Sequence, residues 1–382
     1  MQRVLSFIKK EKLFSLLFIS ILILSLRNLI IPLQGDETTY FKISKNLLTG
    51  RYYQTNHPST VIPIVPFLMA FFSISKFPYL GFALQKLFHI MLTILGIRFC
   101  YLTMSKLNLD RAVVYSIILL TIISSGFISF LPSLYPESII FVSFWGFIYY
   151  LNEPKTLSNF KKFFLLFILL VFTRYLYAIL GLLVILYYFS FFTSSRKYFL
   201  KVLVISLLLT TPLLFWFKYV YNIESQNLSE ISYFNRFKIG ENPLWYNIKC
   251  GLGLEKHYEV SRINGIPAFI SLFVPITGVR NFFISSVLLL AVFFGLYQKV
   301  KNAIVVNLLL AFSLVMLGFI LAGTGFSRYW LLLLPIIYLG YYLIYAKFFP
   351  NPKYFIRIAQ ILSIVLVLNE IRLTFLILKK IL

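Results

Sequence analysis

The sequence predicts an all-α integral membrane protein with about 11 transmembrane helices. Of its 382 residues, 60% are hydrophobic and only 13% are charged. A soluble domain of this size carries roughly 25% charged residues. Apolar runs long enough to cross a bilayer also recur from one end of the chain to the other. These observations favour a single transmembrane domain over residues 1–382 and exclude an ordinary soluble protein.

The basic residues lie between the apolar runs. The formal net charge is +24, but the lysines and arginines occur in short loops, and no basic region is long enough to form a nucleic-acid-binding domain. Lysine and arginine in such loops orient the helices and contact anionic lipid headgroups. We therefore expect membrane lipids, and no nucleic acid, as partners.

The first apolar run is predicted to be a retained helix. Residues 13–33 follow a basic start, but they form too long a run for a signal peptide and lack a small-residue cleavage site. A shorter apolar run covers residues 133–151. The other runs of spanning length lie at 80–103, 112–131, 199–221, 281–298, 303–322, 329–346 and 355–377.

Residues 163–192 are long for one span and short for two, and Arg174 lies near their middle. A lone arginine at the centre of a bilayer costs at least about 2.5–3.5 kcal/mol. A hairpin of two short helices with Arg174 at its tip removes this cost, so we expect the run to cross twice. Ten spans remain the alternative.

The loop charges predict the orientation. With two crossings at 163–192, most lysines and arginines fall on the side of the N-terminus, as the positive-inside tendency requires. The N-terminus is then cytoplasmic in a plasma (inner) membrane. Two longer segments, residues 34–79 and 222–280, become external loops with interfacial helices. Cys100 and Cys250 fall on opposite faces and are not expected to pair.

Three of the twelve acids sit at the predicted outer mouths of helices. Asp36 and Glu37 follow the first span, and Glu137 follows Pro136 at the start of another. A purely structural role is open for each, since Asp caps helices and an acid in the first turn complements the helix dipole. A functional role of these carboxylates is the alternative.

The order of several motifs resembles the GT-C class of membrane glycosyltransferases, which includes the protein O-mannosyltransferases and the lipid A aminoarabinose transferases. In that class an acidic pair follows the first helix, as Asp36 and Glu37 do here, and an "HP" step at His57 follows in the same loop. His57 stands where the aminoarabinose transferases have lysine. The resemblance continues in "YPES" around Glu137, "FTRYLYAIL" around Arg174, "LFVPITGVRNFF" before the run at 281–298, and "GFSRYWLLLLP" around Arg328 and Tyr329.

The resemblance implies a reaction and a set of site residues. Members of the class move a sugar from a polyprenyl-phosphate donor to an external hydroxyl of a lipid, glycan or protein, with inversion. No cofactor is required, although a divalent metal ion stays open as an alternative. The implied roles are catalysis for Asp36 and Glu37, donor phosphate binding for Arg174, Arg328 and His57, and substrate binding for Glu137, Tyr40 and Tyr329.

Two other functions remain alternatives. A transporter or flippase of lipid-linked sugars usually places ionisable residues near the bilayer midplane, where most of the spans in this chain have no acids. A polymerase or ligase of surface glycans also uses lipid-linked sugars but does not need the Asp-Glu loop. Arg174 and Arg328 also have a simpler interpretation as interfacial anchors of their helices.

Overall fold

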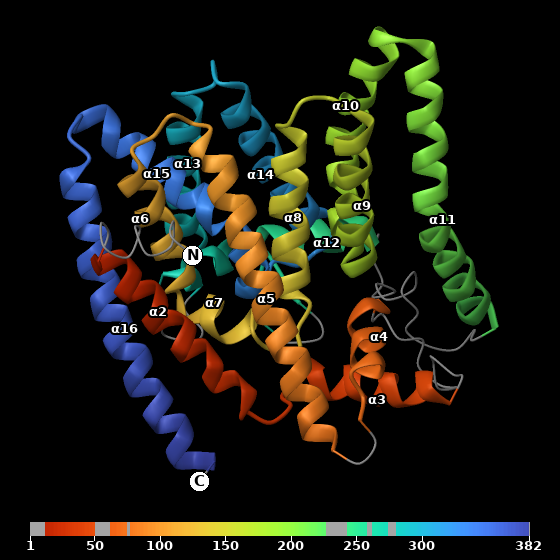
Figure 1. Cartoon of the computed structure of the whole chain (residues 1–382), viewed down its shortest axis with the longest axis horizontal. Coiled ribbons are helices and arrows are strands. Elements are labelled where there is room, and N and C mark those ends of the chain that lie inside the picture. The colour runs from red at the N-terminus through yellow and green to blue at the C-terminus, as the bar shows by residue number, and fades with distance from the viewer. Residues whose placement is uncertain are drawn as a thin grey trace.

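The computed structural model describes residues 12–49, 62–74, 77–226, 243–257, 262–273 and 280–381. These residues form a bundle of helices that run up and down beside one another (Figure 1). The helices and strands are α2 (Lys12–Leu26), η1 (Arg27–Leu29), α3 (Asp36–Leu48), α4 (Ile64–Phe71), α5 (Pro78–Ser105), α6 (Arg111–Ile122), α7 (Ser125–Phe130), α8 (Glu137–Leu151), α9 (Leu157–Thr173), η2 (Tyr175–Leu180), α10 (Gly181–Ser194), α11 (Arg196–Gln226), α12 (Pro243–Leu252), β1 (Lys256–His257), β2 (Arg262–Ile263), η3 (Ile266–Leu272), α13 (Phe282–Tyr297), α14 (Ala303–Leu321), η4 (Ser327–Leu333), α15 (Leu334–Phe348) and α16 (Lys353–Ile381).

Polar residues at the ends of the apolar runs start several of these helices. The side chains of Asp110, Ser124, Thr156, Asn281 and Asn302 each accept a hydrogen bond from a backbone N–H in the first turn that follows. Such caps satisfy donors that have no partner within the helix. The loops therefore fix where each apolar run begins.

Length and composition allow six segments within the described residues to cross a membrane. They begin at Lys12, Pro78, Arg196, Ala303, Ser327 and Lys353, and shorter apolar helices pack among them. The predicted all-α, multi-pass architecture is thus confirmed in this coarse form. The number of crossings and their direction remain predictions.

The helix boundaries depart from the predicted runs at two places. The run at 112–131 is divided into α6 and α7, because Ser124 caps the second piece. The run at 329–346 begins as the tighter helix η4 before it continues as α15. The run at 163–192 is broken at Arg174, as predicted, where the backbone is extended between α9 and η2.

Helix α8 is buried along most of its length, between α5 and α9 (Figure 1). Aromatic rings fill this contact, with Phe147 stacked on Phe163 at 4.5 Å and Phe163 stacked on Tyr187 at 4.7 Å between ring centroids. The indole N–H of Trp145 donates to the Leu332 carbonyl at 3.1 Å, which ties α8 to η4. By contrast, α11 and α16 leave many large apolar side chains exposed, as helices that face lipid do.

The first and last helices are joined by a buried ion pair. Arg27 donates to the Glu370 carboxylate at 2.7 Å and to the Thr374 hydroxyl at 2.8 Å. The other carboxylate oxygen of Glu370 accepts from Ser125 at 2.5 Å. The Arg27 and Glu370 side chains are only 6% and 1% exposed, so this network is closed to solvent.

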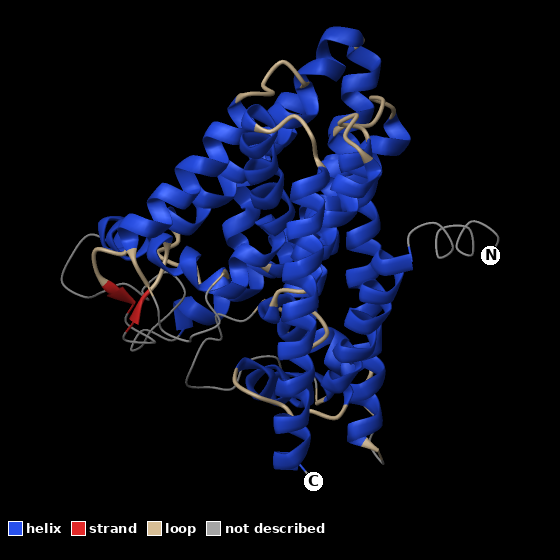
Figure 2. Ribbon diagram, turned by 90° about the vertical axis from the view of Figure 1, so that its left-hand side faces the viewer, coloured by secondary structure: helices blue, strands red, loops and turns tan. Residues whose placement is uncertain are grey.

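The described part of the second predicted loop packs against the bundle. Helix α12 lies on α14, where Asn247 donates to the Leu321 carbonyl at 3.1 Å. An antiparallel pair of two-residue strands, β1 and β2, follows α12 on one flank of the molecule (Figure 2). The all-α prediction missed this pair, because "EKHYEV" and "SRI" carry no apolar alternation. Within the described residues both cysteines are free and buried, which agrees with the prediction that they do not pair.

Candidate functional site

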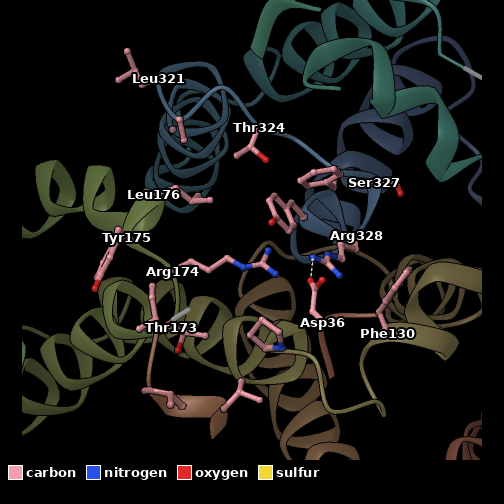
Figure 3. A pocket seen from close by; sticks show the side chains of 18 of the residues that line it. Asp36, Phe130, Thr173, Arg174, Tyr175, Leu176, Leu321, Thr324, Ser327 and Arg328 are labelled. Carbon is pink, nitrogen blue, oxygen red and sulfur yellow. Dashed lines mark hydrogen bonds and ion pairs between the residues drawn. The ribbon is translucent and has the colours of Figure 1, made fainter. Parts of the chain in front are cut away.

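A cavity of about 1160 Å³ lies where the first predicted external loop meets the ends of several helices. Its wall includes α3, the break at Arg174, helix α14 and the turn before η4 (Figure 3). The segments around Asp36, Arg174 and Arg328 are far apart in sequence, and folding brings them to one wall of this space. Asp36, Arg174 and Arg328 make that wall charged. Leu176, Ile179 and Leu321 also line the cavity and give it an apolar side.

Asp36 is the first residue of α3, and Gly35 occupies the cap position. Gly35 has φ +53°, and a Cβ at this position would lie 2.7 Å from the Tyr135 hydroxyl oxygen, so the turn needs glycine. The structural alternative for Asp36, a helix cap, is therefore wrong. Its Oδ2 instead accepts from Arg328 Nη2 at 2.6 Å, while the side chain stays 48% exposed toward the cavity (Figure 3).

Glu137 connects the two predicted arginines. Its Oε1 accepts from Arg174 Nη2 at 2.7 Å and lies 3.4 Å from Arg328 Nε. The Glu137 side chain is 4% exposed and does not line the cavity. We conclude that Glu137 orients Arg174 and Arg328 from behind, so the substrate contact implied for Glu137 finds no support in the geometry.

Tyrosine rings enclose the arginines. The guanidinium of Arg174 lies over the Tyr329 ring at 3.7 Å from its centroid, and that of Arg328 lies over Tyr135 at 4.7 Å. Stacking of this kind holds a planar guanidinium in place while leaving its edge free. Tyr40 and Tyr329 both line the cavity, as the implied substrate contacts require. Burial raises the pKa of the Tyr40 hydroxyl, so it stays protonated as a donor.

Glu37 points away from the cavity and holds the backbone around it. Its two carboxylate oxygens accept from the backbone N–H groups of Gln34 at 2.8 Å and Leu134 at 2.7 Å. Burial raises the pKa of Glu37, while these two hydrogen bonds and the nearby Lys86 act in the opposite sense. Glu37 is 3% exposed. The geometry thus gives Glu37 a role in holding the backbone, and the catalytic role that the resemblance implies for it stays a prediction.

Lys86 of α5 completes this support. Its ammonium group is buried and donates to the carbonyls of Asn28 at 2.8 Å and Ile31 at 2.6 Å. The segment between the first helix and Asp36 is therefore held by Lys86 on one side and by Glu37 on the other. Sequence reasoning missed Lys86 because it lies inside an apolar run, where a lysine looks like a snorkelling residue.

Two further arginines line the cavity, Arg262 in β2 and Arg280 just before α13. Sequence reasoning placed both in a loop of mixed charge and had no signal that they reach the site. His57 and its neighbours lie outside the described residues, so the phosphate contact implied for His57 stays a prediction. Among the described histidine, cysteine and acidic side chains, no group of three or more is placed to hold a metal ion.

Comparisons with protein-family models, with curated proteins and with solved structures find no significant match. The function must therefore be argued from the cavity itself. It offers a partly exposed carboxylate beside fixed cations and an apolar wall, a combination suited to a substrate that carries both a polar headgroup and a lipid chain.

Proposed function

We propose that the protein is an inverting membrane glycosyltransferase that uses a polyprenyl-phosphate-linked sugar as its donor. Its acceptor is a hydroxyl group of a lipid, glycan or protein on the external face. The active site is the cavity at Asp36, and membrane lipids surround the helices. The reaction needs no bound cofactor in this proposal.

The observation that carries the proposal is the position of the Asp36 carboxylate. One of its oxygens is held by Arg328 at 2.6 Å, while about half of the side chain remains open to the cavity. A base must be fixed in direction and still reachable by the hydroxyl it deprotonates. Both conditions are met by Asp36, whereas Glu37 and Glu137 are buried behind the cavity wall.

The proposed reaction is one displacement at the anomeric carbon of the donor sugar. The acceptor hydroxyl gives its proton to Asp36, and its oxygen forms the new bond to the anomeric carbon. The bond from that carbon to the phosphate oxygen breaks, and the electron pair leaves with the polyprenyl phosphate. General base action of this kind contributes about 10²–10⁴-fold to the rate.

The arrangement of the helices supports the same proposal. The connections from α2 to α3, from α7 to α8, from α9 to η2 and from α14 to η4 lie toward one end of the helices (Figure 1), and each of them, or the residue directly after it, lines the cavity. The connections that carry Lys106 and Arg111, and Lys299 and Lys301, lie toward the other end (Figure 1). With the basic end cytoplasmic, the cavity opens on the external side, where the acceptor is expected.

Turnover by Asp36→Asn tests the proposal. Asparagine keeps the shape of aspartate and still accepts a hydrogen bond from Arg328, but it takes up no proton. We expect sugar transfer from a labelled polyprenyl-phosphate sugar to fall by about 10²-fold or more, with an unchanged melting temperature. Wild-type turnover by correctly inserted Asp36→Asn would remove Asp36 from the chemistry.

A transporter or flippase gives a different result in the same experiment. Reconstituted wild-type protein would then move the labelled lipid across vesicles without forming a new glycoside. A polymerase or ligase of surface glycans would form a glycoside but keep its activity in Asp36→Asn. Product analysis of the labelled sugar therefore distinguishes transport from transfer, and the activity of Asp36→Asn distinguishes the proposed transferase from a polymerase or ligase.

A further inference from the structure

The four arginines that line the cavity fall into two pairs with different surroundings. Arg328 and Arg174 are neutralised by Asp36 and Glu137 at 2.6 and 2.7 Å. Within the described residues, neither Arg262 nor Arg280 has a carboxylate within ion-pairing distance, although both face the same space. Among the described residues, the cavity thus has one neutralised pair of arginines and one pair without a compensating carboxylate.

The backbone around Arg262 and Arg280 is anchored. Gly265, which separates β2 from η3, has φ +69°, and a Cβ there would lie 1.9 Å from the Gly251 carbonyl oxygen. After Arg280, the backbone N–H of Asn281 donates to the Pro267 carbonyl at 3.3 Å, and the Asn281 side chain caps α13. These contacts anchor the backbone near each arginine, and both arginines line the same cavity.

The positive charges of Arg262 and Arg280 repel each other across the cavity they both line, and a bound anion relieves that repulsion. Nε of Arg280 is buried and has no hydrogen-bond partner. The same is true of Arg174 Nη1 and Arg328 Nε, but those two guanidinium groups are paired with carboxylates. Burial lowers the pKa of Arg280, and the nearby charge of Arg262 lowers it further. A phosphate group offers several acceptor oxygens to such a pair of forks.

The stereochemistry of inversion also separates the base from the leaving phosphate. In an inverting displacement the attacking oxygen and the leaving oxygen lie on opposite faces of the sugar ring. Asp36, the proposed base, is in direct contact with Arg328. A phosphate bound by Arg328 would lie on the same side as the base, next to a carboxylate that repels it.

We propose that Arg262 and Arg280 form the binding site for the phosphate of the lipid donor, and that Arg174 and Arg328 hold the carboxylates instead. This inference rests on the proposed glycosyltransferase function and replaces the phosphate contacts that the sequence resemblance implies for Arg174 and Arg328. The sugar then lies between the two pairs, and the prenyl chain follows the apolar wall at Leu176, Ile179 and Leu321.

Binding of geranyl phosphate to the purified full-length chain tests this assignment. The protein is placed in nanodiscs of neutral phosphatidylcholine, with geraniol and inorganic phosphate as separate probes. Hydrogen bonds to charged groups are worth enough for each of Arg262→Gln and Arg280→Gln to weaken binding about tenfold or more. We expect Arg262→Lys and Arg280→Lys to retain part of the affinity.

Two further variants serve as controls. Arg328→Gln removes a cavity arginine that is already paired, and we expect its affinity for geranyl phosphate to stay within about threefold of wild type. Arg111→Gln makes the same change at an exposed site outside the cavity, and it should bind like wild type. Melting temperatures of all variants show whether each is folded.

The outcomes separate the site from the function. Loss of binding in Arg328→Gln with full binding in the Arg262→Gln/Arg280→Gln double variant overturns the assignment, whether or not sugar transfer is found. Equal binding of inorganic phosphate and geranyl phosphate overturns the lipid donor as the ligand, as does displacement of the probe by anionic phosphatidylglycerol. If wild type binds geranyl phosphate through Arg262 and Arg280 but transfers no sugar, the site stands and the proposed function fails.

Discussion

Arg27 and Arg328 each form a short ion pair with a carboxylate from a distant segment, but their surroundings differ. Arg27 and Glu370 are 6% and 1% exposed, and Ser125 and Thr374 each form a hydrogen bond with one of them. Arg328 and Asp36 are 17% and 48% exposed and border a large cavity. The same chemical pair therefore joins helices in one place and offers reactive groups in the other.

The comparison shows that burial and access decide the role of an ion pair more than its distance does. The two N···O distances, 2.7 and 2.6 Å, are nearly equal. Removing one partner of a closed pair lowers the free energy of unfolding, because the other charge is then left buried and unpaired. An open pair leaves a carboxylate oxygen accessible from the cavity, so in the proposed reaction its loss would lower turnover.

Removing one partner of the closed pair is expected to have the largest effect. Glu370→Gln leaves the Arg27 charge buried without its carboxylate, which costs about 3–5 kcal/mol of unfolding free energy. We expect a clear drop in the midpoint of an SDS titration in micelles. The double variant Arg27→Met/Glu370→Leu should recover much of the loss, because it buries no charge. If Glu370→Gln unfolds at the same SDS concentration as wild type, the Arg27–Glu370 ion pair does not stabilise the contact between the first described helix and α16.

Glu37→Gln is expected to cost less and to act on stability. Glutamine accepts one of the two backbone N–H bonds, from Gln34 or Leu134, but turns an NH₂ group toward the other. One unsatisfied buried donor costs about 1–3 kcal/mol. We expect a lower melting temperature with near-normal transfer per folded molecule. A normal melting temperature with lost transfer would instead return Glu37 to the catalytic role that the resemblance implies.

Arg328→Lys tests the open pair with a smaller change. Lysine keeps the charge but loses the fork that reaches both Asp36 and Glu137. Loss of one charge-assisted hydrogen bond corresponds to about a tenfold fall in kcat. We expect the KM for the lipid donor to stay unchanged, because in our proposal Arg328 positions the base and Arg262 and Arg280 bind the phosphate. A rise in KM with constant kcat would assign Arg328 to the donor after all.

Much of this arrangement could be predicted from the sequence, because each apolar run has the length and the end signals of a helix. The break at Arg174 follows from the cost of burying a lone charge. The sequence also singled out Asp36 and Glu137 as acids at the predicted outer ends of helices, Arg174 as a charge within an apolar run, and Arg328 by its motif. The structure brings these four together, although no single motif fixes their distances.

The roles of individual residues could not be predicted in the same way. Glu37 and Asp36 are neighbours, but successive helical residues point in directions about 100° apart, so one faces the cavity and the other the protein interior. The pairing of Arg27 with Glu370 joins residues separated by 343 positions, and no local pattern signals it. Arg262 and Arg280 belong to a loop whose path depends on tertiary contacts.

A third ion pair, at the opposite end of α5 from the cavity, completes the comparison with the smallest expected effect. Lys106 donates to Glu153 at 2.9 Å, and the two side chains are 31% and 19% exposed. Partial burial raises the pKa of Glu153, but hydrogen bonds from Tyr149 and Lys106 lower it more, so it lies below its usual 4.5. The contribution of this ion pair to the unfolding free energy is present above the usual pKa of Glu153. It is lost as the pH falls through the lowered pKa.

Lys106→Gln should therefore change the unfolding free energy by about 1 kcal/mol or less near neutral pH. We expect the difference in melting temperature between Lys106→Gln and wild type to disappear at low pH, where protonated Glu153 no longer pairs with Lys106. The control is Glu370→Gln measured alongside at neutral pH, because it removes a carboxylate whose partner stays buried. A loss for Lys106→Gln as large as that for Glu370→Gln would show that solvent access does not distinguish these ion pairs.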